Sequence, residues 1–261
     1  MSKQSVGIFD SGVGGLSCAA PFAKLMPGEN IIYFGDTKNA PYGVRPLEEV
    51  QQLALSIADF LCAQDVKLLA IACNTITVAA LDKIRKAHPE IPVLGTIEPA
   101  SKAAVKEGGN IGVIATPLTI ESGAYEKEIK KLDPYAKVFS LACPKLVPLI
   151  EAGHVNDALI EEIVSEYLDE FVSRYMIDTL ILGCTHFPLI DKLIKRLYPG
   201  IVTISSSGEL AKAAAEYLSK EVQSASPAEY LFYASRLDQN FEKMAAFACP
   251  GLKYKTMQHV L

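Results

Sequence analysis

The sequence lacks the marks of several large classes of protein. It has no apolar run of about 20 residues, the length that spans a membrane, and no apolar stretch of a signal peptide near its N-terminus. Its net charge is −5 and its basic residues are scattered, so it has neither the basic stripe of a nucleic-acid binder nor a polybasic membrane patch. We therefore expect a cytoplasmic protein without nucleic-acid or membrane partners.

The cysteines also lack the patterns of a disulfide framework or a zinc site. The six contain no C-x-x-C pair and no zinc-ligand spacing, and the cytoplasm keeps thiols reduced, so we expect neither disulfides nor a metal. We interpret Cys18, Cys62 and Cys249 as small buried hydrophobic residues. Cys143, in a loop bounded by prolines, has no polar neighbours in the sequence.

Strand-like and helix-like segments alternate along the chain, half of whose 261 residues are hydrophobic. Short buried strands are predicted at 6–9, 31–34, 68–72 and 92–96, and helices at 16–25 and 47–63. This alternation is typical of an α/β protein with a largely parallel sheet.

The pattern restarts near the middle of the chain. Residues 111–122 lie over residues 6–17, with glycine, strand and turn in the same register. Two further apolar runs end at Cys73 and Cys184, and the helical segment after each thiol ends near a proline. We infer an internal duplication, which gives two pseudo-symmetric α/β domains with the active site in the cleft between them.

The predicted domain limits follow from this repeat. The first domain comprises residues 1–97 and 208–261, and the second comprises residues 98–207. The tail has helical, strand-like and helical character at 209–222, 230–233 and 237–247. It has no counterpart between the halves, so we expect it to pack back on the first domain.

A glycine-rich loop follows the first strand. Its spacing suggests a dinucleotide fingerprint, and Asp36 lies about where a ribose-binding acid would be. The third glycine of the fingerprint is replaced by Ser17, however, and Asp10 puts a carboxylate where a pyrophosphate should lie. A tight turn that needs glycine at positive φ explains the glycines but leaves Asp10 and Ser11 without a role.

Cys73 and Cys184 differ from the other cysteines in their position. Each ends an apolar strand, and each precedes a helix-like segment, at 78–86 and at 189–197. Backbone amides and the helix dipole stabilise a thiolate at such a place, so we expect both thiols to have a pKa below the free value of about 8.5.

Few reactions need two such thiols. A cysteine phosphatase requires a phosphate loop with an arginine, which neither segment has, and a Cys–His hydrolase leaves one thiol idle. His186 is two residues from Cys184, a spacing that does not by itself set up a nucleophile–base contact, and the pair lacks enough further ligands for a metal. Two-base proton transfer at a stereocentre uses both thiols, one on each face of the carbon.

Five motifs closely resemble those of the glutamate racemase family, the cofactor-independent branch of the aspartate/glutamate racemase superfamily. They are Asp10-Ser-Gly-Val-Gly-Gly-Leu-Ser17, Gly35-Asp-Thr with Pro41-Tyr-Gly43, Ala72-Cys-Asn-Thr75, Gly112-Val-Ile-Ala-Thr-Pro117 and Leu182-Gly-Cys-Thr-His-Phe-Pro188. The resemblance runs from Val6 to about Leu218. It implies Cys73 and Cys184 as the catalytic acid/base pair, no cofactor, and a role in supplying D-glutamate for peptidoglycan.

The resemblance also implies which residues support the two thiols. Asp10 and Ser11 match the substrate-binding loop, where the aspartate helps the thiol or holds the substrate ammonium. His186 matches the histidine that assists the second thiol. Glu151 matches an acidic residue proposed to assist there, although it also fits a solvated carboxylate at a helix end. By the same resemblance, Cys73 deprotonates D-glutamate and Cys184 deprotonates L-glutamate.

The remaining residues carried over from the family bind the substrate. Tyr42 and Gly43 match a turn that contacts it. An amide and two hydroxyls are offered to a carboxylate by Asn74, Thr75 and Thr185. Two further threonines are expected to line the cleft, Thr116 and Thr119.

The chain departs from the family in places. Ile76-Thr-Val78 stands where members often have small residues, and Val44 replaces a common threonine; both look like packing changes. The chain starts at its first strand, without the N-terminal extension of members activated by a cell-wall precursor, so we expect no such activation. Family members are often dimers, and a homodimer is compatible with the sequence.

Three alternatives stay open. Aspartate racemase, or another member of the superfamily, would share both thiols and differ in the size of the pocket. A cysteine hydrolase would need one thiol only. A two-domain binding protein that closes on an amino acid would explain the cleft but give the two thiols no work.

Overall fold

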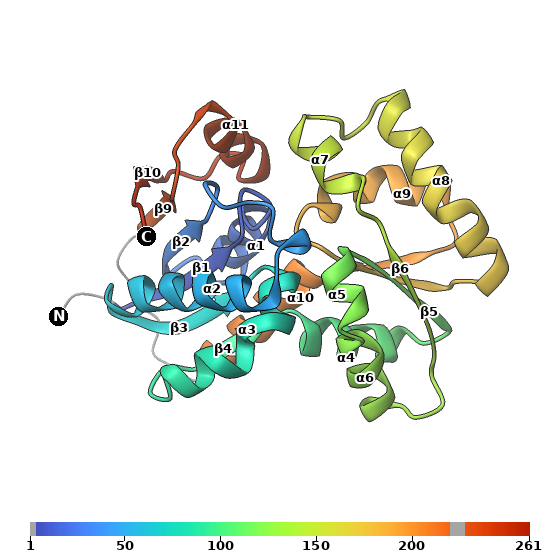
Figure 1. Ribbon diagram of the computed structural model, residues 1–261, viewed down its shortest axis with the longest axis horizontal. Coiled ribbons are helices and arrows are strands. Elements are labelled where there is room, and N and C mark those ends of the chain that lie inside the picture. Colours follow the sequence, from blue (N-terminus) through green and yellow to red (C-terminus); the bar gives the residue numbers. More distant parts are fainter. Residues whose placement is uncertain (1–3, 220–227) are drawn as a thin grey trace.

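The computed structural model describes residues 4–219 and 228–261, and it consists of two lobes that each contain a parallel sheet (Figure 1). The sheet of the first lobe has the order β10-β9-β2-β1-β3-β4. Its strands are β1 (Ser5–Asp10), β2 (Asn30–Gly35), β3 (Val66–Ile71), β4 (Val93–Gly95), β9 (Tyr230–Ala234) and β10 (Lys255–Gln258).

The sheet of the second lobe repeats the central part of the first. Its order is β6-β5-β7-β8, which corresponds strand by strand to β2-β1-β3-β4, and every pair in both sheets is parallel. Its strands are β5 (Asn110–Ala115), β6 (Lys137–Ala142), β7 (Thr179–Gly183) and β8 (Val202–Ser205). The predicted α/β class with two pseudo-symmetric sheets is therefore confirmed.

Helices cover both faces of each sheet (Figure 1). They are α1 (Leu16–Leu25), α2 (Leu47–Cys62), α3 (Asn74–Ala87), α4 (Ile97–Glu107), α5 (Pro117–Glu121), α6 (Ala124–Leu132), α7 (Leu146–Glu151), α8 (Ala158–Tyr175), α9 (Asp191–Leu197), α10 (Ser206–Leu218) and α11 (Gln239–Ala248), with 3-10 turns η1 (Tyr42–Val44) and η2 (Phe187–Ile190). No helix within the described residues is long and apolar enough to cross a membrane.

The apolar layers explain why the strands read as continuous hydrophobic runs. Neighbouring residues of β1 point to opposite faces, so Ile8 joins the cluster under α1, α10 and α11, whereas Phe9 joins the cluster under α2 and α3. The second sheet is likewise covered by α7, α8 and α9 on one face and by α4 and α6 on the other.

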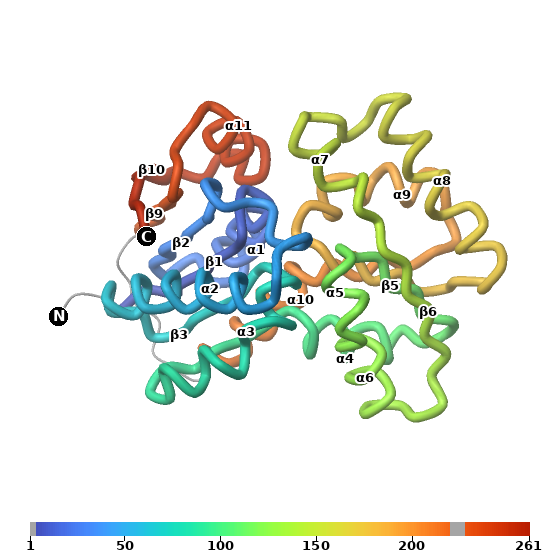
Figure 2. The backbone as a smooth tube through the Cα atoms, viewed as in Figure 1, coloured from blue at the N-terminus to red at the C-terminus, as the bar shows by residue number. Residues whose placement is uncertain are grey.

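The C-terminal tail packs on the first lobe, as expected. After α10 the chain returns to that lobe, where β9 pairs in parallel with β2 (Figure 2). Phe232 of β9 is fully buried, stacks on Tyr254 and lies edge-on to Tyr33. The helix predicted at 209–222 begins earlier, at Ser206, and its predicted end lies outside the described residues.

Helix α10 joins the two lobes. It contacts α1 of the first lobe and α4 of the second, so the same helix contributes to the packing of both. Ser205, the last residue of β8, is also the N-cap of α10. Its Oγ accepts a hydrogen bond from Gly208 N–H, so the helix follows the strand directly. The domain limit at residues 207/208 stays a prediction.

Replacing Phe232 by alanine should destabilise the first lobe, because it leaves a cavity between β9, Tyr33 and Tyr254. The expected loss is about 3–5 kcal/mol in the free energy of unfolding, measured by urea denaturation. Tyr135→Ala serves as the control, since Tyr135 is 92% exposed. An equal, small effect of both substitutions would contradict the packing described for the tail.

Candidate active site

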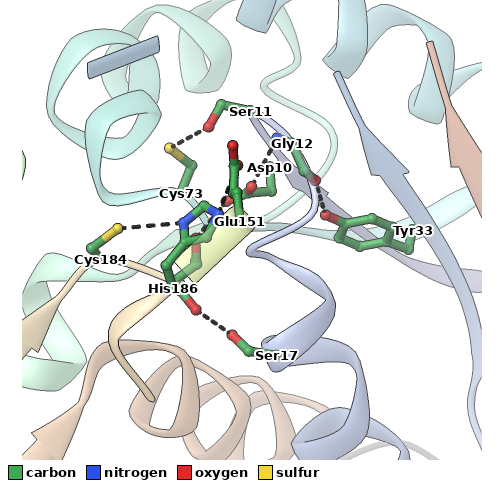
Figure 3. Close-up of polar contacts among 10 residues, drawn as sticks. Asp10, Ser11, Gly12, Ser17, Tyr33, Cys73, Glu151, Cys184 and His186 are labelled. Atoms are coloured by element: carbon green, nitrogen blue, oxygen red, sulfur yellow. Dashed lines mark hydrogen bonds and ion pairs between the residues drawn. The ribbon is translucent and has the colours of Figure 1, made fainter. Parts of the chain in front are cut away.

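The predicted thiols follow two equivalent strands, β3 and β7, and meet in one site between the lobes (Figure 3). Cys73 is the N-cap of α3, and its Sγ accepts a hydrogen bond from Ile76 N–H at 3.4 Å. Its thiol lies 3.5 Å from Ser11 Oγ. Because the cysteine itself caps the helix, α3 begins at Asn74, four residues before the predicted start at Val78.

Cys184 has different surroundings. Its Sγ lies 3.7 Å from His186 Nδ1, and the other ring nitrogen of His186 lies 2.9 Å from Glu151 Oε1. The 3-10 turn η2 follows, and α9 begins at Asp191, two residues after the predicted start at 189 and with the same end, so this thiol does not cap an α-helix as Cys73 does. Cys184 and His186 are thus in contact, although a separation of two residues in the sequence does not by itself predict it.

Asp10 ends β1 and is fully buried. Its carboxylate accepts hydrogen bonds from Gly12 N–H at 2.9 Å and from Thr185 Oγ1 at 3.1 Å. Burial raises the pKa of Asp10, although the charge of His186 and these hydrogen bonds act against that rise. Asp10 of the first lobe is thus paired with Thr185 of the second.

The glycine-rich loop brings the lobes together by lacking side chains. None of its glycines has a left-handed φ, so the explanation by positive φ is wrong. A Cβ on Gly14 would lie 2.5 Å from Thr185 Oγ1 and 2.5 Å from His186 Cε1, and one on Gly15 would lie 2.3 Å from Asp10 Cβ. Only glycine permits the loop to approach these residues so closely.

The predicted carboxylate-binding residues lie around the thiols. Thr75 Oγ1 is 3.0 Å from Thr116 Oγ1 and 3.4 Å from Thr119 Oγ1, so three hydroxyls from both lobes form one cluster. Asn74 donates from Nδ2 to Ser206 Oγ at 3.0 Å. These side chains are mostly buried, as are the two thiols, which are 5% and 6% exposed.

The turn at Tyr42 and Gly43 is held by Asp36. The buried Asp36 carboxylate accepts hydrogen bonds from the Tyr42 hydroxyl, Asn39 Nδ2 and Ser235 Oγ. These partners occupy the carboxylate, which argues against a ribose-binding role. A Cβ on Gly43 would lie 3.0 Å from Thr116 Cβ, so this turn also abuts the second lobe.

The family model described as Asp/Glu/Hydantoin racemase matches residues 17–216. The chain belongs to this family of racemases. A glutamate racemase of Streptococcus pneumoniae is 39% identical over 251 residues, which is 94% of each chain. The chain described here is therefore an isomerase of the racemase class.

Solved structures agree. A glutamate racemase of Francisella tularensis in complex with D-glutamate is 33% identical, with a TM-score of 0.91 over 100% of this chain and 98% of that one. A glutamate racemase isoform of Bacillus anthracis is 36% identical, with a TM-score of 0.93 over 100% and 99% of the two chains. The arrangement of the two sheets is thus that of solved glutamate racemase structures.

The predicted site residues come from loops and element ends that contact one another across the boundary between the lobes. They are Asp10, Ser11, Tyr42, Gly43, Cys73, Asn74, Thr75, Thr116, Thr119, Glu151, Cys184, Thr185 and His186. Away from them, a groove of about 1350 Å³ opens between α3, α4, α6 and α10, and none of these residues lines it. Among the described residues, no three His, Cys, Asp or Glu side chains gather as metal ligands would.

Three residues at the site were not predicted. Ser17 donates from Oγ to the Thr185 carbonyl at 2.7 Å, and Tyr33 donates to the Gly12 carbonyl. Tyr125 donates to Asn74 Oδ1 at 2.6 Å. Ser17 is the last residue of the motif that begins at Asp10, so the sequence could have indicated its role. Tyr33 and Tyr125 lie outside the five motifs.

The electrostatics of Cys73 are opposite to the expectation. Burial and the nearby Asp10 carboxylate raise the pKa of Cys73 to about 12, and they outweigh the hydrogen bonds from Ser11 and Ile76 N–H, which lower it. The charge of Cys184 also raises this pKa, which indicates that the two sulfurs share one site. The prediction of a lowered pKa is therefore wrong for Cys73.

His186 is held in its charged form. Burial alone would lower the pKa of its imidazole, but the hydrogen bonds and charges of Cys184 and Glu151 raise the pKa to about 10. Both ring nitrogens then carry protons near neutral pH, one facing the sulfur and one facing the carboxylate. The histidine thus presents a cation to Cys184.

The titration of His186 tests this arrangement. Between pH 6.5 and about 10 the folded chain holds a proton that the unfolded chain releases, so the stability from this group is complete below pH 6.5 and is lost as pH rises through 10. We expect the ¹⁵N resonances of its ring, assigned with His186→Asn, to titrate near pH 10 and at lower pH in Glu151→Gln. A wild-type midpoint near 6.5 would refute the account.

Proposed function

We propose that the chain is a glutamate racemase that interconverts L- and D-glutamate with two thiols and no cofactor. The observation that carries the proposal is the delivery of two buried thiols, by equivalent strands of the two sheets, to one polar site. The named relatives and the bound D-glutamate of one solved neighbour support glutamate as the substrate.

In the proposed reaction, the two thiols act on opposite faces of the α-carbon. The Cys73 thiolate removes the α-proton of D-glutamate, and the electron pair of the broken C–H bond stays on the substrate. The Cys184 thiol then donates its proton to the other face, which gives L-glutamate and a Cys184 thiolate. The reverse reaction starts from that thiolate, so each thiol serves as base for one enantiomer and as acid for the other.

The substrate itself has a part in activating Cys73. Burial and the Asp10 carboxylate raise the pKa of this thiol. An ammonium group bound beside Asp10 would offset that negative charge, and the thiolate would then form only when substrate is present. Cys184 relies instead on the cationic His186, which Glu151 holds at 2.9 Å.

The carbanion needs stabilisation because the α-proton of an amino acid is poorly acidic. The donors available to the α-carboxylate are the Asn74 amide and the Thr75 hydroxyl, in a site largely closed to solvent, where such donors act strongly. The Thr185 hydroxyl already donates to Asp10, so it binds substrate only if that hydrogen bond is exchanged.

We further propose the cellular role that the family implies. The enzyme would supply D-glutamate for peptidoglycan in the cytoplasm, with domains formed by residues 1–97 with 208–261 and by residues 98–207. A homodimer is part of this proposal, and gel filtration with light scattering tests it.

Removal of either thiol should slow racemisation strongly and leave exchange on one enantiomer. In D₂O, Cys184→Ala should incorporate deuterium into D-glutamate without inversion, because Cys73 removes and returns the proton on one face. Cys73→Ala should do the same with L-glutamate only. Racemisation should fall by at least about 10²-fold, the scale of a lost acid or base, whereas the control Cys62→Ala should keep the wild-type rate. Wild-type racemisation by both single variants would overturn the two-thiol mechanism.

His186 should matter for one thiol only. In the Cys73→Ala background, His186→Asn should slow deuterium exchange into L-glutamate by about 10²-fold, because the cation beside Cys184 is lost. In the Cys184→Ala background, the same substitution should leave exchange into D-glutamate within about threefold, read by proton NMR. Equal slowing in both backgrounds would argue against the pairing of His186 with Cys184.

A further inference from the structure

The Asn74 amide lies in a chain of hydrogen bonds that crosses the lobe boundary. Tyr125 Oη of α6 donates to Asn74 Oδ1 at 2.6 Å, and Asn74 Nδ2 donates to Ser206 Oγ of α10 at 3.0 Å. Ser206 Oγ in turn donates to the Leu182 carbonyl of β7 at 2.9 Å. All three side chains are buried.

The direction of every bond in this chain follows from its last acceptor. A backbone carbonyl can only accept a hydrogen bond, so the Ser206 hydroxyl donates its one proton to the Leu182 carbonyl. It must therefore accept the hydrogen bond from Asn74. The amide nitrogen therefore faces Ser206, and its oxygen faces the Tyr125 hydroxyl, which donates. An asparagine amide can flip by 180°, but a flip here would set Oδ1 against the Ser206 oxygen, whose proton is already donated to Leu182, and would take Oδ1 away from the Tyr125 hydroxyl.

Tyr125 also touches the strand that ends at the second thiol. Its ring packs beside Gly183, where a Cβ would lie 3.1 Å from Tyr125 Cε2. One side chain thus contacts the residue before Cys184 with its ring and the residue after Cys73 with its hydroxyl.

We propose that Tyr125 is a positioning residue of the reaction, one that acts through Asn74. With Oδ1 held by Tyr125 and one N–H held by Ser206, the amide keeps a single free N–H in a fixed orientation for the α-carboxylate of the substrate. This inference rests on the proposed function, and it adds a residue that lies outside the motifs found in the sequence. Without the Tyr125 hydroxyl, only the bond to Ser206 holds the amide, so its free N–H loses its fixed orientation toward the carboxylate.

A double-mutant cycle tests the proposal. Tyr125→Phe removes only the hydroxyl, and we expect it to lower kcat/KM for glutamate by about tenfold in the wild-type chain, as the loss of a buried hydrogen bond does. In the Asn74→Ala background, the same substitution should change kcat/KM by less than about twofold, because its target is gone. Ser206→Ala, which releases the other end of the amide, should behave in the same way. The control Tyr198→Phe, which removes a hydroxyl bonded to Asp169, should leave kcat/KM unchanged.

The outcomes separate the inference from the function. An equal effect of Tyr125→Phe with and without Asn74 would show a merely structural role and overturn the inference, while the racemase itself would stand. A wild-type protein that neither turns over nor binds glutamate in calorimetry would overturn both. Thermal unfolding of each variant confirms that it is folded; if Tyr125→Phe does not fold, the Ser206→Ala cycle decides.

Discussion

The site depends on a buried polar contact between the lobes. Asp10 at the end of β1 is a carboxyl group whose charged form burial disfavours, whereas Thr185 of the second lobe and the nearby charge of His186 favour that form. Ser17 adds a second tie to the Thr185 carbonyl. These contacts are possible only because Gly14 has no side chain. The positions of the glycines, of Asp10 and of His186 therefore depend on one another. That constraint brings the two strand ends, and hence the two thiols, to one place.

The duplicated fold gives the thiols equivalent positions and different chemistry. Cys73 caps an α-helix, contacts Ser11 and lies in the field of Asp10, which raises its pKa. Cys184 is followed by a 3-10 turn and faces a cationic His186 supported by Glu151. In the proposed reaction, each thiol acts on one face of the carbon and so meets a different enantiomer. The asymmetry of the neighbours fits that proposal.

Much of this arrangement is predictable from local pattern, and the limits are physical. Strands that end at Cys73 and Cys184 and the restart at residue 111 predict two similar sheets, because hydrophobic periodicity and repeats are local signals. The sequence around Cys73 predicts a lowered pKa, whereas burial and Asp10, which tertiary packing places near the thiol, raise it. The glycine-rich segment by itself suggests positive φ, because the close approach of other residues depends on distant parts of the chain. Tyr125 meets Asn74 only through the packing of α6 against the site.

The most direct test is the optical activity of L-glutamate with the purified protein alone. After dialysis against a chelator and treatment with hydroxylamine to remove metals and any pyridoxal cofactor, circular dichroism should decay to zero as the racemic mixture forms. L-Aspartate under the same conditions should keep its signal, which separates the proposed substrate from the smaller one. A stable L-glutamate signal, or a decay only after a cofactor is added, would contradict the account of two thiols held together by the lobe boundary.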